Sequence, residues 1–277
     1  MTPATGRDVL ITGAAGGLGA AAAAHLVARG WRVFGADLEP PSSPGIVPIA
    51  MDVTDDESVT AGVAAVAALT DRLTGVVHFA GIFRIGALLD IDARVLAEVL
   101  DVNVLGAHRV TRAAFPLIQH GRGRVVLVSS ETGVQSGTPF NGPYSMSKHA
   151  VESYGDSLRR ELMFLGVPVI KLQPGPFRTE MLTSIVPRYE AAARESTHFR
   201  ELMGGLLARL PVEQAKAHDP AVLAAVVEEA LTARRWRPAY LVRPDRQRMM
   251  LDRLPVRAAD LALRLFVRRL QRRGRRG

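Results

Sequence analysis

The segment Thr12-Gly-Ala-Ala-Gly-Gly-Leu-Gly19 gives the strongest indication of the fold in this sequence. It follows the short apolar run Val9–Thr12 and opens an alanine-rich segment with helical spacing, Gly19–Arg29. Glycines there permit a tight turn and let the backbone approach a pyrophosphate closely, while the N-terminus of the helix offers free N–H groups. We therefore predict a dinucleotide-binding turn between a strand and a helix. A glycine-rich turn that only packs is the alternative.

Short apolar runs alternate with helix-length segments along most of the chain. This alternation predicts a parallel sheet covered by helices, and the near-continuous apolar strands fit a sheet buried on both faces. The expected strands are Val9–Thr12, Arg32–Ala36, Ile46–Met51, Gly75–Phe79, Arg124–Ser129, Val167–Leu172 and Ala239–Val242. Further expected helices are Ser58–Leu69, Val99–Ile118 and Tyr144–Leu165. We expect an α/β fold with a doubly wound, Rossmann-type sheet: one domain over residues 1–245 and a basic helical appendage over 246–277.

The composition narrows the classes of function. With 277 residues, 48% of them hydrophobic and 22% charged, the chain is large enough for one domain with a substantial core. It contains no cysteine, which excludes disulfides, thiol catalysis and cysteine metal sites. The seven histidines show no H-x-x-x-H pair, so we expect no metal centre. The sequence shows neither a signal peptide nor an apolar run long enough to span a membrane, and we expect a cytoplasmic protein.

Basic residues concentrate at the C-terminus. Fifteen arginines and three aspartates lie between Arg234 and the end of the chain, whereas the remaining residues carry 20 basic and 24 acidic side chains. This distribution argues against a general nucleic-acid-binding surface. From Leu251 onward two stripes at helical spacing are expected, an apolar one of Val256, Ala259, Leu263, Phe266, Val267 and Leu270 and a basic one of Arg253, Arg257, Arg264, Arg268 and Arg272. Two hypotheses follow: peripheral attachment to an anionic membrane, or docking on the domain itself or across a dimer.

Two aspartates follow the second and third expected strands. At the end of the second strand, Asp37 can accept hydrogen bonds from the ribose hydroxyls of adenosine and would repel a 2′-phosphate. Because neither Gly16 nor Leu38 offers a compensating positive charge, we predict NAD(H) rather than NADP(H). The alternative is that Asp37 only ends the strand. Asp52 is predicted to bind the adenine amino group or, alternatively, to cap the helix that begins near Asp55.

The run Tyr144-Ser-Met-Ser-Lys148 carries the predicted chemistry. Four residues make one helical turn, so the phenol and the ammonium share a face. A phenol is a poor acid–base group at neutral pH, and a fixed positive charge one turn away lowers its pKa. Such a pair can move a proton to or from an alcohol oxygen. Alone, the pair is typical of a solvated helix face; downstream of a nucleotide-binding turn it indicates catalysis.

From about Val9 to Thr179 these segments resemble the short-chain dehydrogenase/reductase family. The resemblance implies a catalytic set of Asn103, Ser130, Tyr144 and Lys148, with Ser129 as the alternative to Ser130. It implies dinucleotide contacts from Thr12, Gly13, Gly17, Leu18, Gly19, Asp37, Asp52, Val53, Ala80, Gly81, Asn103, Tyr144, Lys148, Pro174, Gly175 and Thr179. In one departure, His78-Phe79-Ala80-Gly81 stands where the family has Asn-Asn-Ala-Gly. Phe79 cannot make the hydrogen bonds of that asparagine, which puts the local sheet or the edge of the pocket in question.

The same resemblance implies hydride transfer between nicotinamide C4 and a carbinol carbon. Tyr144 would exchange the hydroxyl proton, and Lys148 would lower the pKa of this tyrosine and hold the nicotinamide ribose. Ser130 would bind the substrate oxygen. Asn103 would position a water that links Lys148 to solvent, and Thr179 would bond the carboxamide.

An apolar segment beyond Thr179 reads as a helical lid over roughly residues 180–215. It includes Met181, Leu182, Ile185, Val186, Tyr189, Phe199, Leu202, Met203, Leu206 and Leu207, with Phe177 just before it. Its apolar character suggests a lipophilic alcohol or ketone such as a sterol, retinoid or fatty derivative. The stretch is also similar to hydroxysteroid and retinol dehydrogenase-like members of the family. The alternative is that these side chains pack on the sheet or on a partner subunit. The rival functions are an NADP-linked carbonyl reductase of the same fold and a non-catalytic dinucleotide-binding regulator. The family also implies a homo-oligomer.

Overall fold

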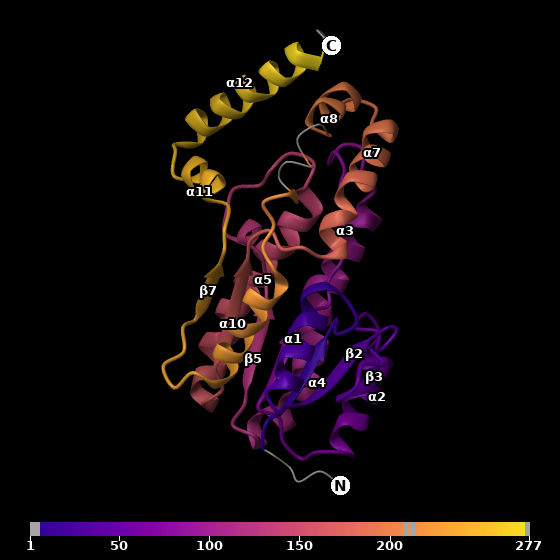
Figure 1. The fold of residues 1–277 in the computed structure, drawn as a ribbon, viewed down its shortest axis with the longest axis vertical. Helices are drawn as coiled ribbons and strands as arrows, with labels where there is room; N and C mark the ends of the chain where they lie inside the picture. Colours follow the sequence, from indigo (N-terminus) through magenta and orange to yellow (C-terminus); the bar gives the residue numbers. More distant parts are fainter. Residues whose placement is uncertain (1–5, 208–209, 211–213, 275–277) are drawn as a thin grey trace.

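A seven-stranded parallel sheet forms the centre of the fold, which we describe from a computed structural model over residues 6–207, 210 and 214–274 (Figure 1). The strands are β1 (Asp8–Thr12), β2 (Arg32–Asp37), β3 (Ile46–Ala50), β4 (Gly75–His78), β5 (Arg124–Val128), β6 (Val169–Pro174) and β7 (Ala239–Val242). Their order in the sheet is β3-β2-β1-β4-β5-β6-β7. The order reverses between β1 and β4, and in such sheets the crevice at this reversal is where ligands bind.

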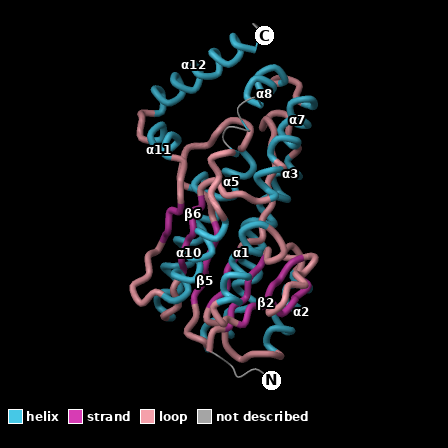
Figure 2. The backbone as a smooth tube through the Cα atoms, viewed as in Figure 1, coloured by secondary structure: helices cyan, strands magenta, loops and turns pink. Residues whose placement is uncertain are grey.

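Helices cover both faces of the sheet (Figure 2). They are α1 (Gly17–Ala28), α2 (Asp56–Ala67), α3 (Ala93–Leu100), α4 (Gly106–His120), α5 (Gly142–Leu162), α6 (Glu180–Thr183), α7 (Ile185–Glu195), α8 (Arg200–Leu207), α10 (Pro220–Thr232), α11 (Arg246–Asp252) and α12 (Val256–Gly274). On one face, Leu26 of α1 and Val227 of α10 share a core cluster with Ile11. On the other, Val63 of α2 and Val110 of α4 pack with side chains from α5. The predicted doubly wound α/β sheet is thus confirmed.

The sequence predicted all seven strands to within two residues at their ends. The largest shift is at β6, which begins after Pro168 because a proline cannot donate to the hydrogen-bonded ladder. The segment expected as a helix over Val99–Ile118 is helical throughout, although the helix already begins at Ala93. A π-helical segment, η1 (Asp101–Leu105), lies between α3 and α4 there. Periodicity alone cannot reveal such a segment, and segments of this kind frequently mark functional sites.

Neither α10 nor most of α3 was predicted, whereas α11 falls within the helical appendage expected over 246–277. Asp219 accepts a hydrogen bond from the amide of Ala221, and Pro220 occupies the first turn of α10, so the start signals were present in the sequence. α11 is short, and Asp245 caps it by accepting from the amides of Gln247 and Arg248.

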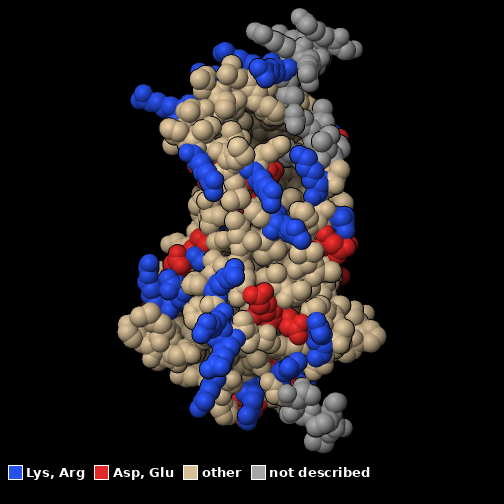
Figure 3. Space-filling model, turned by 60° about the vertical axis from the view of Figure 1, so that its left-hand side comes forward, with Lys and Arg blue, Asp and Glu red and all other residues tan. Residues whose placement is uncertain are grey.

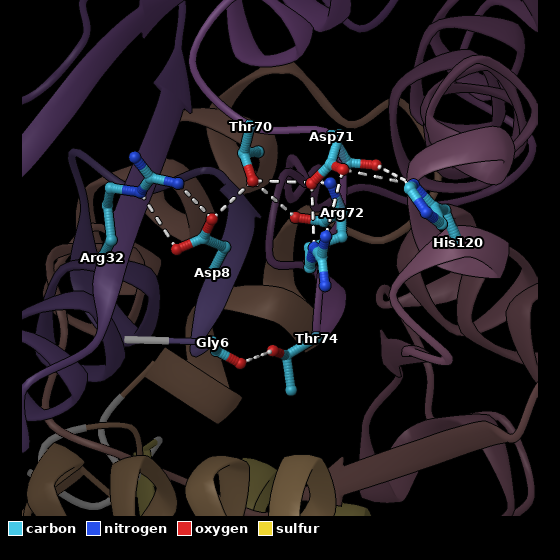
Figure 4. Close-up of polar contacts among 8 residues, drawn as sticks. All are labelled: Gly6, Asp8, Arg32, Thr70, Asp71, Arg72, Thr74 and His120. Carbon is cyan, nitrogen blue, oxygen red and sulfur yellow. Dashed lines mark hydrogen bonds and ion pairs between the residues drawn. The ribbon is translucent and has the colours of Figure 1, made fainter. Parts of the chain in front are cut away.

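A network of hydrogen bonds and ion pairs joins β1 to its neighbours at the edge of the sheet where the strands begin (Figure 4). Buried Asp8 of β1 accepts a hydrogen bond from the Nε of Arg32, at 3.0 Å, and one from the hydroxyl of Thr70, at 2.6 Å. Nearby, Arg72 pairs with Asp71. This edge is opposite the carboxyl ends of the strands, so we assign the network to the fold and not to the site.

The C-terminal helix α12 extends along one end of the molecule and contacts α8 (Figure 1). Of its predicted apolar stripe, Ala259, Phe266 and Val267 are partly buried, whereas Val256 and Leu263 are exposed. The side chains of Leu270 and Arg272 lie outside the described residues. Among the helices that the structure describes, none combines the length and the hydrophobicity that a membrane span requires.

Candidate active site

The carboxyl ends of four central strands bring the predicted site residues to one edge of the sheet. Thr12 pairs with His78 and His78 with Leu127, while Val128 pairs with Leu172. The segments that follow β1, β4, β5 and β6 therefore begin side by side. These segments carry the glycine-rich turn, Ala80-Gly81, the two serines and the stretch that starts at Pro174.

The glycine-rich turn is too tight for side chains at two of its glycines. A Cβ at Gly13, whose φ is +69°, would lie 2.6 Å from the amide nitrogen of Ala80. A Cβ at Gly19 would lie 2.0 Å from the carbonyl oxygen of Gly13. No side chain caps the first turn of α1, and no acidic residue lies there. This cradle of backbone, with free N–H groups at the start of a helix, fits a pyrophosphate.

Phe79 stands at the position of the family's asparagine and packs in the core where that asparagine would make hydrogen bonds. Its ring packs against the core cluster that includes α1, and its Cβ would lie 3.3 Å from a Cβ at Gly19. Its amide donates to the carbonyl of Thr12 at 3.0 Å, and the hydroxyl of Thr12 accepts from the amide of Ala80 at 3.3 Å. Leu18 packs against the same cluster. Backbone bonds and the Thr12 hydroxyl thus join β1 and β4 here without the asparagine of the family.

Asp37 lies beside the glycine-rich turn. One carboxylate oxygen accepts from the amide of Ala15 at 2.9 Å, and the other accepts from the amide of Leu38 at 2.9 Å. The side chain therefore does more than end β2: it fixes the turn at the expected position of the adenosine ribose. Each carboxylate oxygen can accept a further hydrogen bond.

Asp52 and Val53 follow β3 as expected. One oxygen of Asp52 accepts from both the amide, at 2.8 Å, and the hydroxyl, at 2.7 Å, of Thr54, and these bonds lower the pKa of Asp52. The alternative in which Asp52 caps α2 is wrong, because Asp55 does so by accepting from the amide of Glu57 at 2.9 Å. Val53 is buried and lies in the space that a Cβ at Gly106 would need.

Asn103 is buried in the π-helical segment, and both ends of its amide group are used. The Oδ1 accepts from the amide of Ile82 at 2.7 Å, and the Nδ2 donates to the Ile82 carbonyl at 3.0 Å and to the Ser147 hydroxyl at 2.9 Å. Gly81 lies so close that a Cβ would be 3.2 Å from the Oδ1. The side chain of Asn103 thus joins the segment after β4 to α5.

The structure separates the two serines that follow β5. The Ser129 hydroxyl donates to the carbonyl of Lys148 at 3.3 Å, which directs it to the backbone of α5. Ser130 hydrogen-bonds with Tyr144, and its hydroxyl also accepts from the amide of Thr132 at 3.2 Å. Lys148 is buried, its Nζ lies 5.5 Å from the ring centroid of Tyr144, and it donates to the carbonyl of Val128 at 2.9 Å.

The expected fall in the pKa of Tyr144 is not found. Burial raises the pKa of Tyr144 to about 12, a hydrogen bond with Ser130 opposes this, and the charge of Glu131 adds to it. Burial also lowers the pKa of Lys148 to about 8, against the charge of Glu152. Desolvation is the largest cause of both shifts, and helical spacing alone could not predict it. At neutral pH the Tyr144 phenol therefore carries its proton.

The segment after β6 closes on the glycine-rich turn. Pro174 is buried at the end of β6, and a Cβ at Gly175 would lie 2.1 Å from the carbonyl oxygen of Arg243. Thr179 begins α6 by accepting from the amide of Leu182 at 3.3 Å, and its methyl carbon would lie 3.4 Å from a Cβ at Gly17. A cleft of about 650 Å³ opens here, lined by Gly17, Arg178, Thr179, Glu180, Leu182, Thr183, Gln214 and Ala215.

Much of the apolar lid segment packs within the protein. Tyr189 and Met203 are buried in a cluster with Phe140, which leads into α5, and Phe199, Leu202, Leu206 and Leu207 pack against this cluster. Phe177 belongs to the main core instead. Phe177 thus packs on the sheet, as the alternative expected, whereas the cluster around Phe140 contains no strand residue. Met181 is exposed. The range 180–215 also includes residues outside the described ones.

Sequence reasoning missed three residues near Tyr144. The rings of Phe83 and Tyr144 pack edge to face with their centroids 5.0 Å apart. No residue spacing in the sequence indicated this contact. Ser147, inside the Tyr144–Lys148 run, bonds Asn103. Glu131 directly follows the serine pair; it is buried and accepts from the amide of Asp245 at 2.6 Å, and burial raises its pKa.

α11 is attached to the loop between β5 and α5. Asp252 accepts from the amide of Ser136 at 2.8 Å and from its hydroxyl. Together with the bond between Glu131 and the Asp245 amide, this contact crosses the boundary expected at residue 245. The division into domain and appendage stays a prediction.

Comparison with known proteins identifies the family of this chain. The family model of short chain dehydrogenases matches residues 7–190. An uncharacterized oxidoreductase, YbbO, of Escherichia coli (strain K12) is 36% identical over 186 residues, which are 65% of this chain and 69% of that protein. Human retinol dehydrogenase 16 is 40% identical over 184 residues, 62% of this chain and 57% of that protein. Human 17-beta-hydroxysteroid dehydrogenase type 6 is 35% identical over 212 residues, 72% and 66% of the two chains. The match thus spans little more than half of the human retinol dehydrogenase.

Solved structures share the fold. A short-chain dehydrogenase from Streptomyces avermitilis superposes with a TM-score of 0.73 at 25% identity, covering 97% of this chain and 98% of that one. A 3-ketoacyl-(acyl-carrier-protein) reductase from Brucella melitensis, solved with NADH, gives a TM-score of 0.71 at 20% identity, covering 86% and 97%. This chain belongs to the short chain dehydrogenase family and is an NAD(P)-dependent oxidoreductase that acts on alcohols or ketones.

Proposed function

We propose that this protein transfers a hydride between NAD(H) and a lipophilic secondary alcohol or ketone. The observation that carries the proposal is the contact between Ser130 and Tyr144, with Lys148 one helical turn away, at the sheet edge that holds the glycine-rich turn. A bound nicotinamide supplies or accepts the hydride at C4. The described residues fit such a group, because Gly13 and Gly19 leave only backbone where the pyrophosphate would lie.

Side chains of the protein transfer the proton that accompanies the hydride. In reduction, the Tyr144 hydroxyl donates its proton to the ketone oxygen as the hydride reaches the carbon; in oxidation the proton moves back. The Ser130 hydroxyl donates a hydrogen bond to the same oxygen, where negative charge develops. Lys148 provides positive charge beside the phenol, and Asn103 holds the segment after β4 against α5. A chain that only bound dinucleotides would have no use for this set.

NAD(H) is proposed over NADP(H) because of Asp37. Its carboxylate lies at the end of β2 and is fixed by two amides, so a 2′-phosphate placed there would meet a fixed negative charge. The lipophilic substrate is proposed from Phe83, which lies against Tyr144, and from relatives named for retinol and 17-beta-hydroxysteroids. A homo-oligomer stays a prediction.

Turnover measurements with a substrate panel test this proposal. We expect NADH-linked reduction of sterol ketones or retinal with a kcat/KM at least tenfold above that for simple sugars, because an apolar ring borders the phenol. The measurement is NADH fluorescence, with NADPH as the paired cofactor. Absence of turnover on every member of the panel would favour the non-catalytic regulator, and a preference for NADPH would favour the NADP-linked reductase.

We also propose that the C-terminal helices lie on an anionic membrane surface. α11 and α12 expose large apolar side chains, among them Met250 (70% exposed), Val256 (75%) and Leu261 (56%), between arginines. Figure 3 shows basic side chains along this face of the molecule, including the end near the C-terminus. Apolar residues among arginines are typical of helices that lie in a lipid interface.

Vesicle flotation with the full-length chain tests the membrane proposal. Replacing Arg257, Arg264 and Arg268 by Gln should weaken binding to phosphatidylserine vesicles roughly 100-fold, at about 1 kcal/mol for each arginine. The matched control replaces Arg29, Arg72 and Arg94, exposed arginines on the body of the domain, by Gln. Equal binding by the two triple variants would contradict the proposal. Truncation at Asp245 is a poorer test, since it also removes the contact of Asp252 with Ser136.

A further inference from the structure

A row of charged side chains, buried except for its far end at Asp156, begins at Lys148 and leads away from the site. Lys148, Glu152 and Asp156 follow one face of α5 at four-residue spacing, and Lys171 reaches this face from β6. Lys148, Glu152 and Lys171 are 7%, 8% and 6% exposed. Burying an isolated charge costs several kcal/mol, so charged side chains of alternating sign beneath the site must compensate one another.

Both carboxylate oxygens of Glu152 are held in place. The Nζ of Lys171 lies 2.8 Å from the Oε2 of Glu152 and 2.9 Å from the Oδ1 of Asp156. The Nε2 of Gln173 donates to the Oε1 of Glu152 at 3.0 Å. Gly155 makes room for Lys171, since a Cβ there would lie 2.9 Å from the Cδ of that lysine. Glu152 is therefore a fixed negative charge one helical turn from Lys148.

Lysine is rare in this chain. The sequence contains only Lys148, Lys171 and Lys216, while its other basic residues are arginines. Two of the three lysines belong to this row of charged side chains, whereas Lys216 is exposed. Lysine differs from arginine in being a compact charge that loses its proton readily when buried. Lysine is thus used at two positions where an ammonium is desolvated.

We propose that Glu152 is a positioning residue for the reaction: its carboxylate, fixed by Lys171 and Gln173, keeps Lys148 charged beside Tyr144. The role of Lys148 in this inference rests on the proposed function. Besides Lys148, the titratable groups of this part of the fold, among the described residues, include Tyr144, Glu152 and Asp156 on α5, Glu131 before α5 and Lys171 on β6. Among them, Glu152 is the anion that acts on Lys148.

The rarity of lysine allows a direct test. Full-length protein labelled with [ε-¹³C]lysine gives one NMR signal for each of three lysines, and Lys216→Arg and Lys171→Met assign them. Lys148 is expected to titrate at about pH 8, because burial outweighs the effect of Glu152. Glu152→Gln keeps the shape of the side chain and removes its charge, so the Lys148 midpoint should fall by about one pH unit.

Two further variants make the test independent of any damage by Glu152→Gln. Lys171→Met removes a neighbouring cation and leaves Glu152 bonded to Gln173, so the Lys148 midpoint should rise. Asp156→Asn is the matched control: it touches the same Lys171 but lies two helical turns from Lys148, and it should move the midpoint by less than half as much as Glu152→Gln. A merely structural role would lower the Tm without moving the midpoint.

The titration needs neither substrate nor NADH, so its outcome is separate from the proposed function. An unchanged Lys148 midpoint in Glu152→Gln, or an unchanged or lower one in Lys171→Met, would overturn the inference. If turnover is found, the loss of activity at alkaline pH should shift down in Glu152→Gln by the amount that the midpoint falls, since Lys148 then loses its proton at lower pH. If the Lys148 midpoint shifts as expected but no turnover is found, only the proposed function would be contradicted.

Discussion

Replacement of Tyr144 by Phe should lower kcat about 1000-fold while the Kd for NADH stays within about twofold. The variant loses only the hydroxyl that would carry the proton, because its ring can keep the edge-on contact with Phe83. Steady-state kinetics on a substrate from the panel and fluorescence titration with NADH measure the two effects separately.

Tyr154→Phe is the matched control for this prediction. Tyr154 is also on α5, and burial raises its pKa to about 12 as well, but its hydroxyl bonds Thr111 rather than Ser130. We expect this variant to keep kcat within about threefold. An equal loss in the two variants would mean that removing a buried hydroxyl from α5 is harmful in itself, and the proton-transfer role of Tyr144 would then lose its support.

Replacement of Asp37 by Ala should reduce the preference for NAD(H) over NADP(H) roughly 100-fold. The carboxylate contributes charged hydrogen bonds to the ribose, each worth about 1.5–3 kcal/mol, and its loss also removes repulsion of a 2′-phosphate. The ratio of kcat/KM for the two cofactors measures the change.

Asp37→Asn separates the effect of the negative charge on cofactor preference from the effect of the hydrogen bond that holds the glycine-rich turn. The amide keeps one oxygen that can accept from Ala15, so the glycine-rich turn should stay in place while the negative charge is lost. We expect this variant to lose most of the preference with little change in Tm. Asp55→Ala, which removes a helix cap nearby, should leave the cofactor ratio unchanged. If Asp37→Asn and Asp37→Ala both keep the wild-type ratio, Asp37 does not select the cofactor.

The sheet could be predicted from the sequence because its strands are buried on both faces and read as apolar runs. The glycine-rich turn could also be predicted, because its glycines act within a short stretch of chain. Gly13 and Gly19 leave no room for a Cβ, as expected for a tight turn between a strand and a helix. Tyr144 and Lys148 could be placed on one face because four residues make one helical turn.

The remaining features depend on contacts between distant segments. The pairing of Asn103 with Ile82 arises in a π-helical segment that periodicity does not reveal. The direction of the shift in the pKa of Tyr144 depends on burial, which spacing does not give. Lys171 meets Glu152 only because β6 passes beside α5. The packing of the lid cluster likewise follows from the path of the chain, so apolar character alone could not distinguish a substrate pocket from a core.

A single-turnover experiment with NADH-loaded protein determines whether Tyr144 supplies the proton for hydride transfer. On mixing with a ketone, the wild-type protein should oxidise its bound NADH at a rate that matches or exceeds kcat. Tyr144→Phe should hold NADH with the same fluorescence and oxidise it about 1000 times more slowly. Oxidation at the wild-type rate in this variant would contradict the account.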